Sequence, residues 1–428
     1  MPRTLREGQR GALVEMLQWG LRQAVCCPQT DGIFGAGTLR ALQAFQQTQA
    51  LEADGIAGAQ TWKALHPYLI NCFVHTVQPG DTPRKLAAHY DSTPGAILVA
   101  NQLKESVQLL AGANIKIPSN KAVVPTNIRW SSCLLDYVLQ GLKARFPFLQ
   151  ITKIGSSVLG QPIWLVRIGK GKKRVGYNAA HHANEWLTTP VLLHFLEQYA
   201  AGVAHGGHLG GVEYTRLFEN YTLDMVPMVN PDGVDLVTGA LDTSSEAFLT
   251  AKEIAAGFPF IPFPDGWKAN IRGIDLNLCY PADWKKAQRA KFAKGFVKPA
   301  PRDYVGTMPL DAPEAHAMYT HTLAEDYRLI LAYHSQGKLI YWKYNGYDPA
   351  GSWALANRMQ GLSGYAAETT PDYSGSAGYK DWFIARYNRS GYTIEVGAGQ
   401  NPLPTSQFDQ IYRDNIGILL LGMIGLEE

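Results

Sequence analysis

The sequence predicts a multidomain protein in which a small helical module and a small βααβ module precede a large α/β domain with a doubly wound, mixed sheet. Three observations support this prediction. A short pattern recurs within the first 70 residues, strand-like runs open and close the segment 74–118, and strand-like and helix-like segments alternate from residue 128 onward. Such alternation is typical of a largely parallel sheet covered by helices, with its functional site at the carboxyl ends of the strands.

Length and composition narrow the class of protein. The 428 residues are enough for two or three domains, and a net charge of +3 does not indicate a nucleic-acid partner. Residues 1–7 lack the apolar core of a Sec signal peptide, and the longest apolar run, 416–426, is too short to span a bilayer. The five cysteines have no metal-type spacing, and their odd count favours free thiols in a reducing compartment.

The first module, residues 1–70, contains an internal repeat. The segment 31–42 (DGIFGAGTLRAL) recurs at 54–65 (DGIAGAQTWKAL), and each copy predicts a glycine-rich turn that opens a helix. The module resembles the peptidoglycan-binding module of bacterial wall hydrolases. A helical bundle without affinity for the wall is the alternative.

The second module covers residues 74–118. A strand runs into a Pro-Gly turn, two short helices follow, and a strand closes the segment at 115–118. This order resembles a LysM domain, and the resemblance implies binding of glycan strands that contain N-acetylglucosamine. Residues 119–127 are predicted to be a linker.

In the large domain, residues 128–428, segments with the apolar periodicity of strands alternate with segments that have the apolar periodicity of helices. The segment 235–265 is rich in Gly, Pro and Phe and is predicted to be an insertion near the site. The predicted strands are 163–168, 175–180, 223–229, 329–334, 339–342 and 392–396, and the predicted helices include 190–203, 313–326, 351–360 and 406–424.

Three residues at predicted strand ends form a candidate zinc site. His182 and Glu185 follow the strand-like run 174–180, and His334 ends the run 329–333. Two histidines and one glutamate leave a fourth zinc position open, as in catalytic sites. His194 and Glu197 have the same spacing as His182 and Glu185, but they lie inside a helical pattern and are predicted to form a helix face.

Two further residues are candidates for catalysis. Glu395 lies within an apolar, β-branched strand, where a carboxylate is costly unless it has a task, so it is a candidate general base. A solvent-facing position on an edge strand is the alternative. Tyr373 begins a loop rich in Gly and Ser that can bring a phenol over the site.

Together these stretches resemble the catalytic domain of the zinc metallocarboxypeptidase family. The resemblance implies one Zn²⁺ per chain, with His182, Glu185 and His334 as its ligands. It also implies that Glu395 is the general base and Tyr373 the mobile tyrosine of the family.

The sequence departs from the family at two places. Lys268 occupies the position of the arginine that polarises the scissile carbonyl, and Asn277-Leu278 replaces the Asn-Arg pair that binds a terminal carboxylate. Loss of that arginine argues against simple C-terminal trimming. The pattern is similar to the bacterial γ-D-glutamyl-L-diamino acid endopeptidases. Further polar candidates for binding substrate are Arg272, Lys380 and Asp381.

The predicted function is therefore zinc-dependent hydrolysis of peptidoglycan stem peptides at the γ-D-glutamyl–diaminopimelate bond. The resemblance implies the cytosol of a sporulating cell, or the spore, as the location. Two alternatives stay open. One is a carboxypeptidase for wall peptides in which Arg272 or Lys380 substitutes for the missing clamp, and the other is a non-catalytic wall-binding protein. The oligomeric state is not predicted.

Overall fold

The computed structural model describes residues 2–25, 29–370 and 376–425. The chain divides into two compact units, Met1–Gln150 with Glu197–Gly206, and Ile151–Leu196 with Gly207–Glu428. Among the described residues, no helix has the length and apolar character that crossing a membrane requires.

The sequence repeat of the first unit has a structural cause. The helices that carry it are α1 (Ala12–Ala24), α2 (Ala36–Thr48) and α3 (Ala59–Leu69). Gln18 in α1 donates to Asp31 over 2.8 Å and accepts from the next backbone N–H over 2.9 Å. Gln46 in α2 holds Asp54 and its neighbour in the same way, over 2.8 and 3.0 Å. Each copy is thus an Asp-Gly turn held by a glutamine from the preceding helix.

The predicted βααβ order is also found in this unit. Its elements are β1 (Cys72–Thr76), α4 (Pro83–His89), α5 (Pro94–Ala100) and β2 (Asn114–Pro118), with β1 and β2 antiparallel. Thr82 and Thr93 cap the two helices, and a proline opens each of them. The Asn101 side chain donates to the Lys116 carbonyl and accepts from the Lys116 N–H, which ties the end of α5 to β2. Helix α6 (Ser132–Arg145) follows.

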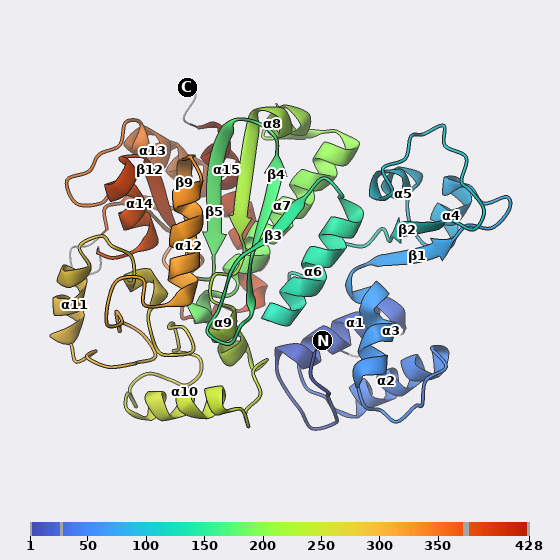
Figure 1. Cartoon of the computed structure of the whole chain (residues 1–428), viewed down its shortest axis with the longest axis horizontal. Coiled ribbons are helices and arrows are strands. Elements are labelled where there is room, and N and C mark those ends of the chain that lie inside the picture. The colour runs from blue at the N-terminus through green and yellow to red at the C-terminus, as the bar shows by residue number, and fades with distance from the viewer. Residues whose placement is uncertain (1, 26–28, 371–375, 426–428) are drawn as a thin grey trace. The chain divides into compact units, whose positions relative to one another are not determined.

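The second unit is built on an eight-stranded mixed sheet with the order β11-β10-β12-β9-β5-β8-β4-β3. Figure 1 labels five of these strands, β12, β9, β5, β4 and β3. Strands β12, β9, β5 and β8 are mutually parallel, whereas β10 and β4 run antiparallel to their neighbours β12 and β8. The strands are β3 (Gln150–Ser156), β4 (Pro162–Gly169), β5 (Lys173–Ala179), β8 (Tyr221–Val226), β9 (Tyr327–Ser335), β10 (Leu339–Tyr341), β11 (Ala366–Glu368) and β12 (Ser390–Val396). A separate two-stranded ribbon pairs β6 (His208–Leu209) with β7 (Val212–Glu213).

Helices cover both faces of this sheet, so the predicted doubly wound mixed fold is confirmed. On one face, Ile330 and Ala332 of β9 share a core with residues of α12 (Pro313–Ala324) and α14 (Tyr379–Tyr387). On the other, Tyr177 of β5 donates to the Leu419 carbonyl of α15 (Phe408–Ile424), which packs on α13 (Ser352–Ser363). Figure 1 shows α12 in front of the sheet and α15 behind it.

The predicted strands are all present, but several helices were not predicted. These are α6, α8 (Tyr214–Asn220), α9 (Pro231–Thr238), α10 (Glu246–Ala256), α11 (Trp284–Phe292) and α14. All residues of α9, and residues 379–384 of α14, are buried, so over these residues neither helix has an exposed face. Helix α10 lies inside the segment 235–265, which was predicted to be an insertion near the site, with no helix assigned to it. Helix α7 (Thr188–His205) begins two residues before its predicted start.

Candidate active site

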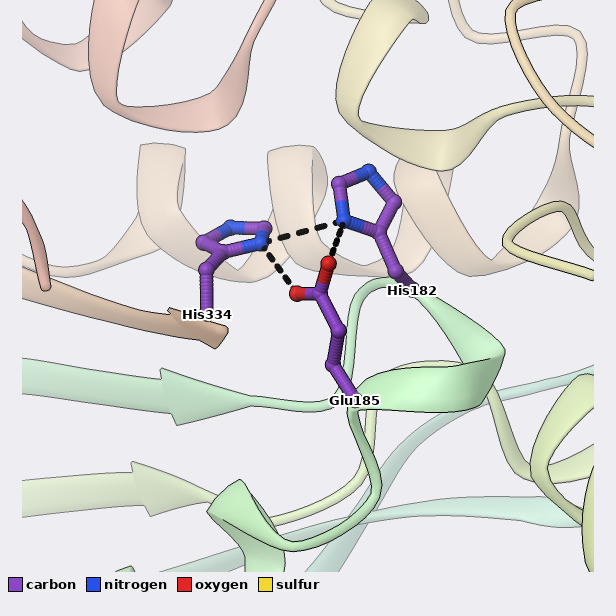
Figure 2. A group of neighbouring side chains, drawn as sticks. All are labelled: His182, Glu185 and His334. Atoms are coloured by element: carbon purple, nitrogen blue, oxygen red, sulfur yellow. Dashed lines mark hydrogen bonds and ion pairs between the residues drawn. The ribbon is translucent and has the colours of Figure 1, made fainter. Parts of the chain in front are cut away.

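The turn after β5 presents His182 and Glu185. Ala180 adopts a left-handed backbone with φ of 50°, and the chain then forms the short 3₁₀ turn η1 (Ala183–Glu185). The Thr188 hydroxyl accepts from the Ala180 N–H over 3.0 Å and donates to the Glu185 carbonyl over 2.7 Å. These bonds fix the turn, so the imidazole and the carboxylate point to the same place (Figure 2).

His334 reaches that place from the neighbouring strand. Because β9 runs parallel to β5, with Tyr333 opposite Ala179, both strands deliver their last residues to one edge of the sheet. His334 Nδ1 lies 2.9 Å from Glu185 Oε2, and His182 Nδ1 lies 2.9 Å from Glu185 Oε1. The two Nδ1 atoms are 3.2 Å apart (Figure 2). The sequence-predicted metal set is therefore assembled.

These three residues fit a zinc ion. Two nitrogen donors and a carboxylate are the ligands of catalytic zinc sites, at about 2.0–2.2 Å from the metal. Two nitrogen donors on one tetrahedral ion would lie about 3.3 Å apart, close to the observed separation of 3.2 Å between the Nδ1 atoms. Together with Glu185, the two histidines can hold the ion through their Nδ1 atoms.

A second group with suitable spacing, Asp224, His321 and Glu325, does not fit a metal. Arg167 donates to both oxygens of Asp224 over 2.6 and 2.7 Å, and to Glu325 over 2.7 Å. The half-buried Arg167 already pairs with these carboxylates, so a metal ion would meet a like charge.

Asp275 orients the first ligand. Its Oδ1 lies 3.2 Å from His182 Nε2, and its Oδ2 accepts the Asp303 N–H over 3.1 Å. Burial favours the neutral carboxyl, but the charge of His182 and the hydrogen bonds outweigh it and hold the pKa of Asp275 well below its usual range. His334 Nε2, in contrast, has no hydrogen-bond partner in the described parts of the chain.

We therefore expect Asp275→Asn to lower the zinc affinity about 10- to 100-fold, because an outer carboxylate fixes the ligand ring and raises its basicity. Competition against a chelator measures this change. Asp326→Asn, which removes an exposed carboxylate paired with Arg389, is the matched control and should leave the affinity unchanged. Equal affinities in the two variants would show that Asp275 does not support the metal.

Lys268 places a positive charge beside the three candidate ligands. Its ammonium donates to Glu185 over 2.8 Å. Burial lowers the pKa of Lys268, but the Glu185 charge outweighs it, so this pKa is raised. For Glu185 burial acts in the opposite direction and raises the pKa, but the charges of His182 and Lys268 outweigh it and hold this pKa well below its usual range. Burial lowers the pKa of His334, which keeps its imidazole neutral and able to bind a metal.

Glu395 lies next to His334 across the sheet. The two residues are paired in the parallel register of β12 and β9, so the Glu395 carboxylate reaches the same edge. The residue is partly exposed, and its carboxylate has no hydrogen bond or ion pair within the described residues. Burial raises its pKa, and the charge of Glu185 raises it further. Such a carboxylate is suited to accept a proton.

Two adjoining cavities open at this edge, with volumes of about 620 and 170 Å³. Apolar residues, among them Phe260, Ile261 and Phe296, line part of the larger cavity. The smaller cavity contains His182 and Asp275 in its wall. Residues that line both cavities are Lys268, Arg302, Asp303, Tyr341 and Glu395.

The predicted substrate-binding residues have different surroundings. Asn277, Leu278, Lys380 and Asp381 all line the smaller cavity. The Lys380 ammonium already has three partners: it forms an ion pair with Asp381 Oδ1 at 2.6 Å and donates to the Lys343 carbonyl over 2.9 Å and to Thr370 Oγ1 over 3.0 Å. Asn277 Oδ1 accepts the Tyr379 N–H over 3.0 Å and thereby anchors the start of α14.

Arg272 is the described site candidate that does not reach these cavities, and Tyr373 cannot be placed. Arg272 is absent from the described lining of both cavities, and its guanidinium donates to the Asp311 carbonyl over 2.7 Å. Tyr373 lies outside the described residues, so its predicted place is not tested.

Sequence reasoning did not single out Asp275, Lys291, Arg302 or Asp303 as site residues. Asp275 lies in the stretch 273–277 (GIDLN), and a carboxylate between two apolar residues there was a usable signal. Arg302 and Asp303 lie between α11 and α12 without any periodic pattern, so the sequence offered no signal for them.

Comparisons with known proteins agree with this arrangement. The family model described as zinc carboxypeptidase matches residues 135–417, the peptidoglycan binding domain model matches 10–65, and the LysM domain model matches 75–118. The gamma-D-glutamyl-L-diamino acid endopeptidase 1 of Lysinibacillus sphaericus is 43% identical over 285 residues, which cover 67% of this chain and 70% of that protein.

Solved structures show the same fold at low sequence identity. Thrombin activatable fibrinolysis inhibitor aligns with a TM-score of 0.55 at 15% identity, over 74% of this chain and 89% of that one. Carboxypeptidase A from Helicoverpa armigera aligns with a TM-score of 0.52 at 19% identity, over 72% of this chain and 78% of that one. The chain therefore belongs to the zinc carboxypeptidase family and is a zinc metallopeptidase.

Proposed function

We propose that this peptidase hydrolyses peptidoglycan stem peptides at the amide between γ-D-glutamate and the L-centre of diaminopimelate. Its endopeptidase relative from Lysinibacillus sphaericus and its matches to two wall-binding domain models support this substrate class. The two N-terminal modules would hold the glycan strands. The domain limits stay predictions: 1–70 and 74–118 for the two modules, 119–127 for the linker and 128–428 for the catalytic domain. The setting in sporulating cells also stays a prediction.

The observation that carries the choice of bond is Leu278 in the smaller cavity. It is 8% exposed and stands where the resemblance places the arginine that binds a terminal carboxylate. A carboxylate placed against leucine would lose water without gaining a charged partner, which is unfavourable. A peptidase that cuts within a stem peptide holds no terminal carboxylate at that position, so an apolar side chain is acceptable there.

The chemistry we propose is attack of water on the amide carbon. His182, Glu185 and His334 would hold the zinc ion, which when bound supplies Lewis acidity and makes water a better nucleophile. Glu395 accepts the proton of the attacking water and gives it to the nitrogen as the carbon–nitrogen bond breaks. The Lys268 ammonium stabilises the negative charge that develops on the carbonyl oxygen. The resemblance adds Tyr373 as a mobile residue over the site.

A muropeptide containing γ-D-glutamyl–diaminopimelate, offered beside N-blocked C-terminal dipeptides, tests this assignment. We expect cleavage of the muropeptide at that bond, and at least about 30-fold slower hydrolysis of the dipeptides, because an unmatched buried charge costs about 2 kcal/mol or more. Mass spectrometry of the products identifies the bond. Equal rates would reject the endopeptidase assignment in favour of a carboxypeptidase with a substitute clamp.

A further inference from the structure

Arg302 lies where the two cavities meet. It lines both of them together with Lys268 and Glu395, the residues to which we assign the developing oxyanion and the proton. A substrate that spans both cavities must therefore pass this guanidinium. Arg302 was not predicted as a site residue, because it lies in no predicted strand and at neither of the two positions where the sequence departs from the family.

The guanidinium has one edge free to bind a ligand. Arg302 Nε donates to Asp303 Oδ2 over 2.9 Å, and Asp303 also pairs with Lys291 of α11. The side chain is 43% exposed, and its two terminal nitrogens have no hydrogen-bond partner within the described residues. A guanidinium held through Nε presents its Nη atoms as a planar fork, which matches the two oxygens of a carboxylate.

The other cations that line these cavities are already engaged. Each of their ammonium groups has a carboxylate partner: Lys268 pairs with Glu185 at 2.8 Å, Lys380 with Asp381 at 2.6 Å, and Lys291 with Asp303. Lys380 additionally donates to two neutral acceptors. Among the described residues, Arg302 is thus the cavity cation whose terminal nitrogens have no partner.

The position of Arg302 indicates which substrate carboxylate it meets. Asn277 and Leu278, at the family's clamp positions, line the smaller cavity, so the leaving residue enters there and the acyl residue occupies the larger one. In a γ-linked glutamyl residue, the free α-carboxylate is separated from the scissile carbonyl by two methylene groups and one Cα. We infer that Arg302 binds this α-carboxylate and selects γ-linked glutamyl substrates, an inference that rests on the proposed function.

Two muropeptides that differ only at this group test the inference: one carries the glutamyl α-carboxylate, and the other carries the α-carboxamide. For the wild-type chain we expect kcat/KM to favour the carboxylate about 10- to 100-fold, mainly through KM, as one charge-assisted interaction provides. Arg302→Gln should remove this preference by lowering kcat/KM on the carboxylate toward its value on the carboxamide. Arg302→Lys, which keeps the charge without the fork, should retain part of the preference.

Arg289→Gln is the matched control, because this exposed arginine of α11 is not among the residues that line either cavity. The Arg289→Gln variant should favour the carboxylate substrate as strongly as wild type does. The preference is the ratio of two kcat/KM values measured on the same protein sample. A lower folded fraction reduces both values equally and therefore does not change the ratio. If Arg302→Gln slowed both substrates equally, or if wild type showed no preference, the inference would fail while the proposed function stood. Cleavage of neither substrate by wild type would remove the proposed function as well.

Discussion

Replacing either histidine of the predicted metal set, in His182→Ala or His334→Ala, is expected to abolish stoichiometric zinc binding and peptidase activity. Each change removes one of three donors that converge within 2.9–3.2 Å of one another. The remaining histidine and Glu185 cannot complete a three-ligand catalytic site. Binding to insoluble peptidoglycan should persist, because the segments matched by wall-binding models, 10–65 and 75–118, contain neither histidine.

Zinc content after dialysis, measured by atomic spectrometry, and turnover of a defined muropeptide check this result. His208→Ala is the matched control, since this exposed histidine of β6 lies 3.8 Å from Glu213 and outside the metal set. About one zinc per chain is expected in wild type and in the control. Stoichiometric zinc in both ligand variants would show that the ligands lie elsewhere, and a zinc-loaded wild type without turnover would favour the non-catalytic alternative.

The central part of the sheet and the metal set were predictable for the same reason. Parallel strands that alternate with helices end at one edge of a sheet, so His182 and His334, each just after an apolar run, had to come together if both runs were parallel neighbours. The register of β5 against β9 shows this relation directly. Glu395 follows the same logic on β12. The strands β3 and β11 were missed because neither contains a buried residue and β11 is only three residues long.

The cations that line the cavities could not be ranked from the sequence. Arg272 and Arg302 both lie in irregular segments, and only the path of each segment decides which guanidinium reaches the cavity. Lys380 does reach it, but its ammonium already has an ion-pair partner and two hydrogen-bond acceptors, which residue type and spacing do not reveal. Tertiary contacts of loops, unlike strand ends, leave no periodic trace in a sequence.

Glu395→Gln should leave the zinc content and the fold intact and lower kcat about 10²–10⁴-fold, the range typical of a general base. The amide has nearly the same shape as the carboxylate but cannot accept the proton of the attacking water. The site favours this role, since the Glu395 carboxylate lines both cavities beside Lys268 and has no competing partner within the described residues. Its position opposite His334 in the sheet keeps it next to the candidate zinc ligands.

Single-turnover kinetics with the γ-D-glutamyl–diaminopimelate muropeptide measure the loss, with zinc content and thermal unfolding followed in parallel. Glu253→Gln, at an exposed position of α10, is the matched control and should retain the wild-type rate. Because the substitution leaves Lys268 and the three candidate ligands unchanged, carbonyl polarisation should survive and substrate affinity should change little. A Glu395→Gln variant that kept kcat within a few-fold of wild type would assign the proton transfer to another group.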